Sequence, residues 1–181
     1  MADLHPRIAE IVAALHDAHA EMRAQLAAIP AALHDLPAPD GRWSIAQHIE
    51  HLAMVDDGAG RVISNIIKQV AAADAKETDD SSLLHSLDAF RPWAVGTPIK
   101  APAMVEPAAG LSAAEALERL EACRARMIGA LERGSGLALG TVHFPHPVIG
   151  PITGYQWGLF PAHHQRRHTA QIRALGATLS A

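Results

Sequence analysis

Two histidines four residues apart, His164 and His168, carry the strongest chemical signal in the sequence. In a helix this spacing places both imidazoles on one face, one turn apart. Both also fall within an apolar stripe and so face inward, where two imidazoles can chelate one metal ion. The alternative is a pair of histidines that are solvated or satisfied by hydrogen bonds in a core. The spacing alone leaves both interpretations open.

A third metal ligand would have to come from another helix, and His48 and His51 are the candidates. Helical geometry places His48 closer to the apolar stripe of its segment and His51 on the flank of that stripe. His48 also occupies the fourth helical position after Ser44, where it can pack on Trp43 as a hydrophobic staple. On that interpretation His51 is free to point across a cleft, and the spacing does not decide between the two.

Two further polar residues, His19 and Gln171, lie where they could assist such a site. His19 lies within the apolar stripe of the first predicted helix, which is typical of a buried histidine bonded to a neighbour. The functional alternative for His19 is a substrate contact or a fourth ligand. His19 and His48 are also the candidates for a catalytic base. Gln171 follows His168 on the inward face, where its amide could orient a ligand imidazole or bond to backbone at the edge of the core.

Four segments with helical periodicity must position these residues. Three of them begin with a capping box, formed by Ser44 and Gln47, Ser112 and Glu115, and Thr153 and Gln156. Their apolar stripes predict an all-α fold, a four-helix bundle in one domain over residues 1–181, with a long crossover between the second and third helices. The predicted helices span about residues 6–28, 44–70, 113–133 and 154–179, with a short helix at about 81–90 and Pro/Gly-rich linkers at 30–41, 92–110 and 134–151.

The composition excludes several classes of protein. Apolar residues make up 49% of the 181 residues and charged residues 19%, enough to bury a core. The formal net charge of −4 and the absence of a basic block argue against a nucleic-acid binder. No apolar run approaches the ~18–20 residues of a membrane span, and no secretory signal is recognised, so a cytoplasmic protein is expected. A single cysteine, Cys123, excludes a disulfide framework and a multi-cysteine zinc site.

Two stretches of the chain resemble the DinB-like superfamily of metal-binding proteins. Residues 43–52, WSIAQHIEHL, are similar to its W-S-x-x-[EQ]-x-x-x-H-L signature. Residues 146–153, HPVIGPIT, and 164–172, HQRRHTAQI, are similar to its H-P-x-x-G-x-[LI]-[ST] and H-x-x-x-H-x-x-Q-[LI] motifs. In element order the resemblance extends from about residue 8 to residue 178.

The resemblance implies a four-helix bundle in which three histidines hold a divalent metal. Carried over to this sequence, the ligands are His51, His164 and His168, which favours His51 over His48. The sequence departs from the family pattern at His48, where an apolar residue is usual. The resemblance also implies a small-molecule substrate, with a low-molecular-weight thiol as the leading class, and a homodimer. The ion would be zinc or nickel, although imidazole suits iron and copper as well.

Three neutral imidazoles would leave a divalent ion with its full charge and an open position, as in catalytic zinc sites. Such an ion can activate a thiol, as in a transferase, or water, as in a hydrolase. The resemblance favours thiol transfer. The competing interpretation is a non-enzymatic, stress-associated protein whose structural metal is closed by a fourth ligand, His48 or His19. A water-filled cleft lined by His19, Trp157 and residues 92–110 would favour the enzyme, and histidines satisfied in the core would leave no metal site.

Overall fold

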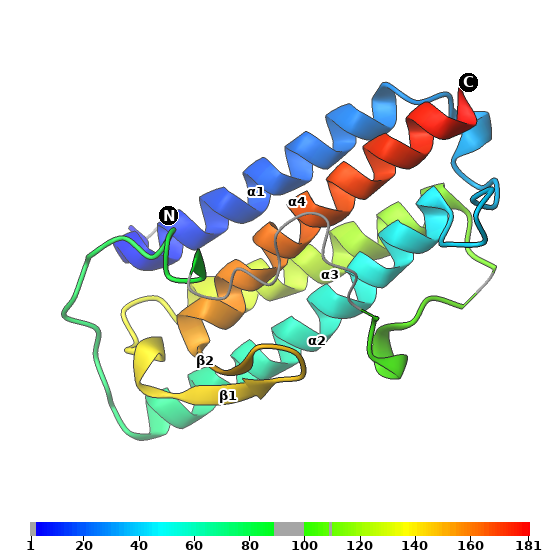
Figure 1. Cartoon of the computed structure of the whole chain (residues 1–181). Coiled ribbons are helices and arrows are strands. Elements are labelled where there is room, and N and C mark those ends of the chain that lie inside the picture. Colours follow the sequence, from blue (N-terminus) through cyan, green and yellow to red (C-terminus); the bar gives the residue numbers. More distant parts are fainter. Residues whose placement is uncertain (1–2, 89–99, 109) are drawn as a thin grey trace.

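The computed structural model describes residues 3–88, 100–108 and 110–181, and these form a bundle of long α-helices (Figure 1). The helices are α1 (Pro6–Ala27), α2 (Ile45–Ala72), α3 (Ala113–Arg133) and α4 (Gly154–Leu179). Helix α1 lies along α4 and α2 lies along α3, while α2 also packs against α4. The predicted four-helix bundle and the long connection between α2 and α3 are confirmed.

All three predicted capping boxes are present at the starts of α2, α3 and α4. In each, the Ser or Thr side chain accepts from the backbone N–H three residues later, and that residue's side chain accepts from the cap's own N–H. These bonds satisfy backbone donors that have no partner within the helix. The predicted helix limits therefore agree with the structure within two residues. Helix α1 begins at Pro6, with the His5 side chain as its cap.

The segment before α4 is more ordered than the predicted linker at 134–151. It contains the 3-10 helix η4 (Leu139–Thr141) and an antiparallel hairpin of β1 (His143–His146) and β2 (Gly150–Thr153). The His146 Nδ1 atom accepts the backbone N–H groups of Val148 and Ile149 at 3.2 and 3.4 Å, which closes the turn. Prolines within both strands argue against a sheet in the sequence, so the hairpin was not predicted.

The helix predicted at about residues 81–90 is wrong over residues 81–87, which form coil and turns. Asp88 has 3-10 geometry, and residues 89–90 lie outside the described residues. Side chains of α1 bind the backbone here: Glu10 accepts the Leu83 N–H at 2.6 Å, and Arg7 Nε donates to the Ser81 carbonyl at 3.1 Å. In a helix that began here, the Ser81 carbonyl would instead accept the backbone N–H of residue 85.

Two apolar clusters fill the two ends of the bundle. The first joins the N-terminal part of α1 to the C-terminal parts of α2 and α3 and the start of α4, and the second lies at the opposite end. Buried polar side chains lie where the clusters meet. Arg124 Nε donates to Asp56 Oδ2 at 2.6 Å and Arg124 Nη2 donates to Gln165 Oε1 at 2.8 Å. This network, which joins α2, α3 and α4, was not predicted from the sequence.

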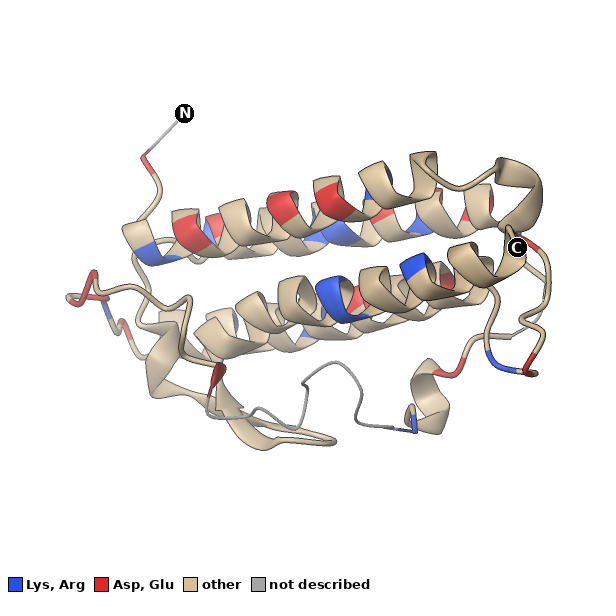
Figure 2. Ribbon diagram, turned by 45° about the horizontal axis from the view of Figure 1, so that its top comes forward, with Lys and Arg blue, Asp and Glu red and all other residues tan. Residues whose placement is uncertain are grey.

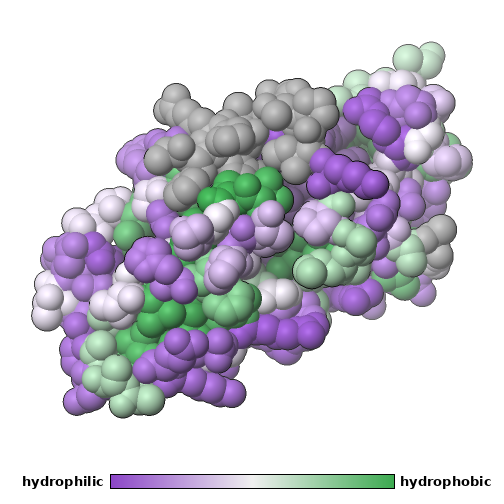
Figure 3. Space-filling view, turned by 60° about the horizontal axis from the view of Figure 1, so that its bottom comes forward, coloured by the Kyte–Doolittle hydropathy of each residue, from purple (hydrophilic) through white to green (hydrophobic). Residues whose placement is uncertain are grey.

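The outer surface carries charges of both signs interspersed along the helices and loops that are described (Figure 2). The face seen in Figure 3 shows apolar areas bordered by hydrophilic side chains. Large apolar side chains that are exposed among the described residues come from separate segments: Leu36, Leu84, Met104 and Val148. None of the helices in the described part of the chain combines the length and the apolar composition that a membrane span requires.

The start of α4 is packed so closely that Gly154 should not tolerate a side chain. A Cβ atom there would lie 2.7 Å from the Leu139 carbonyl oxygen and 2.8 Å from Ile66 Cγ2. We expect Gly154→Ala to lower the free energy of unfolding by about 1–3 kcal/mol. Gly58 is the matched control, because it is exposed on α2 with nothing within 4 Å of an added Cβ. Gly58→Ala should raise the free energy of unfolding by up to about 1 kcal/mol. Urea unfolding followed by circular dichroism measures the stability of both variants.

Candidate metal centre

The structure brings together the three histidines that the family resemblance implied. His51 comes from α2, and His164 and His168 come from α4. The Nε2 atom of His164 lies 3.4 Å from His51 Nε2 and 3.2 Å from His168 Nε2. All three side chains are buried, and their ligand atoms lie within 4.8 Å of one another. We call these residues the histidine triad.

The spacing of the triad fits a bound divalent cation. A tetrahedral zinc ion with Zn–N bonds of about 2.0–2.1 Å keeps its nitrogen ligands about 3.3–3.4 Å apart. The two Nε2 separations, 3.2 and 3.4 Å, are close to that value. The Nδ1 atom of His164 is buried without a hydrogen-bond partner in the described structure, which carries a desolvation cost. A cation bound at Nε2 would not supply a partner for Nδ1, so it is the two short Nε2 separations, together with the three imidazole donors, that suit a metal.

The crossover between α2 and α3 orients one ligand of the triad. Its 3-10 helix η3 (Ala103–Val105) places the Val105 carbonyl oxygen 2.7 Å from His51 Nδ1. A carbonyl oxygen only accepts, so the proton of a neutral His51 must be on Nδ1, and Nε2 presents its lone pair to the triad. Metal-binding histidines usually donate their second N–H in this way. Sequence reasoning missed Val105 because the backbone of any residue can supply this contact.

Burial keeps the triad in the neutral form that metal binding requires. It lowers the pKa of His51, and it lowers the pKa values of His164 and His168 well below the usual range. Neighbouring imidazoles lower the last two pKa values further, because each would oppose a second positive charge. At neutral pH the three rings are therefore available as ligands without first losing a proton.

His48 lies against the outer side of the triad. Its Nδ1 atom is 3.0 Å from Nδ1 of His168, the ring nitrogen that points away from the other triad members. Its ring also packs edge-on against Trp43, with ring centroids 5.5 Å apart, as the staple interpretation predicts. Burial lowers the pKa of His48 to about 4. The structure therefore brings His48 into contact with a ligand of the site.

His19 and Gln171, the other two residues predicted to assist the site, have different surroundings. His19 Nε2 lies 3.2 Å from Glu121 Oε1, and His19 Nδ1 lies 3.4 Å from Gln165 Nε2, so its described contacts lie outside the triad. These contacts favour the interpretation of a histidine bonded to its neighbours. The Gln171 Oε1 atom is buried with no partner in the described structure. An orienting role for Gln171 stays a prediction. Of the loop expected to line the cleft, residues 92–99 and 109 lie outside the described residues.

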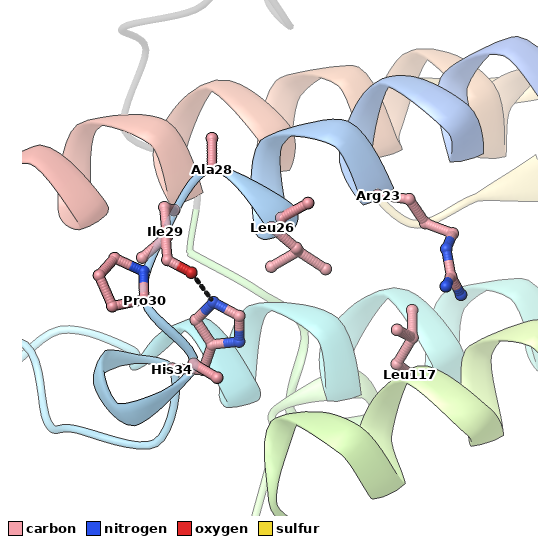
Figure 4. Close-up of a pocket in the computed structure, with 9 residues that line it drawn as sticks. Arg23, Leu26, Ala28, Ile29, Pro30, His34 and Leu117 are labelled. Atoms are coloured by element: carbon pink, nitrogen blue, oxygen red, sulfur yellow. Dashed lines mark hydrogen bonds between the residues drawn. The ribbon is translucent and has the colours of Figure 1, made fainter.

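The surface of the bundle contains two hollows among the described residues. A cavity of about 470 Å³ is bordered by residues that include His48, Trp43 and Gln171. A second one, of about 540 Å³, lies between the end of α1, η1 (Ala31–Leu33) and α3, and Leu26 and Leu117 contribute to its apolar wall (Figure 4). No member of the triad borders either hollow, but the first reaches His48, which contacts His168, whereas the second touches none of these residues.

Comparison with known proteins identifies the family. A profile of the DinB superfamily matches residues 14–172, a range that contains the whole triad. The chain belongs to the DinB superfamily. The chain is also similar to the uncharacterized protein YuaE of Bacillus subtilis (strain 168), with 28% identity over 134 residues, 74% of this chain and 76% of YuaE. No solved structure matched significantly. The resemblance seen in the sequence is confirmed, and the chemistry must be argued from the site.

Proposed function

We propose that this DinB-superfamily protein is a metal-dependent enzyme that acts on a small molecule, with transfer of a low-molecular-weight thiol as its reaction. His51, His164 and His168 would hold the cation, with zinc or nickel expected first and iron or copper as alternatives. The observation that carries the proposal is the buried triad of neutral imidazoles, one of them held in its ligand tautomer by Val105. A divalent ion bound there would lower the pKa of a coordinated thiol or water.

Aromatic side chains pack against the ligands and hold them in place. The Phe160 ring stacks on His164, with centroids 5.1 Å apart and an interplanar angle of 29°. Trp43 covers the other side, with its centroid 4.8 Å from His51 and 6.2 Å from His168. These rings restrict the imidazoles, and ligands that are already ordered need little reorganisation when they bind.

A structural metal in a non-enzymatic protein is the second candidate. The ligands come from two different helices, so a cation bound to the triad would link α2 to α4, which favours a structural role. A closed structural site needs a fourth ligand, and the described residues contribute three to the group. His48 contacts His168 at Nδ1, on the far side from the Nε2 atoms that converge. This arrangement supports an open position and therefore the enzyme.

Metal analysis of protein purified without a histidine tag tests the proposal. We expect close to one divalent cation per chain, a fall in Tm after treatment with a chelator, and turnover of a generic electrophile with a member of a thiol panel. Hydrolysis without a thiol would indicate a hydrolase instead. Bound metal with neither activity would indicate the structural role. Metal-free protein whose Tm is unchanged by chelator would contradict metal binding altogether.

A further inference from the structure

The contact between His48 and His168 shows how a second ligand of the triad could be held. We infer that His48 is a positioning residue: its Nδ1 atom accepts a hydrogen bond from Nδ1–H of His168 and fixes that ring for metal binding at Nε2. The observation is a separation of 3.0 Å between the two Nδ1 atoms, both on buried side chains. The inference rests on the proposed metal binding and adds a residue outside the ligand set.

The direction of this hydrogen bond follows from the protons available. A neutral imidazole carries one N–H, and a ring that binds a metal through Nε2 must carry its proton on Nδ1. His168 therefore donates and His48 accepts, which places the proton of His48 on its own Nε2. Neither nitrogen of His48 is among the buried side-chain atoms that lack a partner in the described structure. His48 also borders the cavity of about 470 Å³, where water can reach it.

The surroundings hold both rings in this geometry. Trp43 packs edge-on against His48 and lies nearly parallel to His168, at an interplanar angle of 19°. His48 lies three residues before His51, so one face of α2 supplies both a ligand and the partner of another ligand. Two of the three ligands thus have an acceptor at Nδ1: His51 has the Val105 carbonyl and His168 has His48.

Loss of the acceptor should weaken metal binding. In His48→Leu the Nδ1–H of His168 would be buried without a partner whenever Nε2 binds a metal, which penalises the bound state. We expect the zinc Kd of that variant to rise about 10–100-fold. His48→Asn keeps an acceptor at the position of Nδ1 and should recover most of the affinity. His19→Leu is the matched control, because His19 is a histidine of the bundle whose described contacts lie outside the triad.

The experiment measures the zinc Kd of each metal-free protein by competition with a chromophoric chelator, and the visible spectrum of the cobalt-loaded form. Circular dichroism checks that every variant is folded. Recovery in His48→Asn, with an altered cobalt spectrum in His48→Leu alone, would support the inference. Equal zinc affinity in His48→Leu and wild type would overturn it and leave the proposed function intact. Equal losses in the Leu and Asn variants would also overturn it, whereas wild-type protein that binds no zinc would overturn the proposed function itself.

Discussion

Replacing His164 with alanine is expected to weaken binding of a divalent cation more than about 100-fold, because a ligand is lost outright rather than merely reoriented. His164 is the central member of the triad, with its Nε2 atom 3.4 Å from that of His51 and 3.2 Å from that of His168. The remaining two ligands come from different helices and chelate poorly. Metal content after dialysis, together with a Kd from chelator competition, measures the loss.

His163 provides a matched control for this change. It is the neighbouring histidine of α4, it is half-buried, and it lies about 100° away around the helix. It is not a member of the triad. His163→Ala should keep the affinity of the wild type, since it removes an imidazole from the same turn without removing a ligand. The reverse pattern, with metal lost in the His163 variant and kept in the His164 variant, would show that the ligands lie on another face.

The helices could be predicted from sequence because their signals are local. A capping box needs residues three apart, and an apolar stripe needs only the helical repeat, so the limits of α3 and α4 agree with the prediction at both ends. The choice between His48 and His51 was different. Both are buried on α2, and which nitrogen meets which partner depends on α4 and on the crossover. Spacing left that choice open, and the family resemblance favoured His51.

The buried ion pair of Asp56 and Arg124 has a signal in the sequence. Asp56 lies between Leu52 and Ala59 in the stripe of α2, and Arg124 continues the stripe of α3. Opposite charges at stripe positions of two helices indicate a pair that is buried together. The Val105 contact had no such signal, because a backbone carbonyl is placed by the path of the crossover and not by its residue type.

The largest effect on stability is expected at Asp56 and Arg124, which are 1% and 5% exposed. Arg124 donates to Asp56, to the Leu15 carbonyl at 2.9 Å and to Gln165, so it joins all four helices. Removing either partner leaves the other charge buried and unpaired. We therefore expect Asp56→Leu and Arg124→Met each to lower the free energy of unfolding by about 3–5 kcal/mol, measured by urea unfolding.

The double variant Asp56→Leu with Arg124→Met separates the charge effect from the loss of packing. It removes both charges, so it should unfold within about 2 kcal/mol of the wild type, because apolar replacement of a buried pair is often neutral. Burial raises the pKa of Asp56, and Arg124 opposes that shift. In Arg124→Met the Asp56 pKa should therefore rise further in the folded state. The loss of stability relative to the wild type should then grow as the pH rises from the unfolded-state pKa of Asp56 through its folded-state pKa. If the loss of stability in the double variant equals the sum of the losses in the two single variants, the two charges are not coupled. The network would then stabilise the bundle through packing alone.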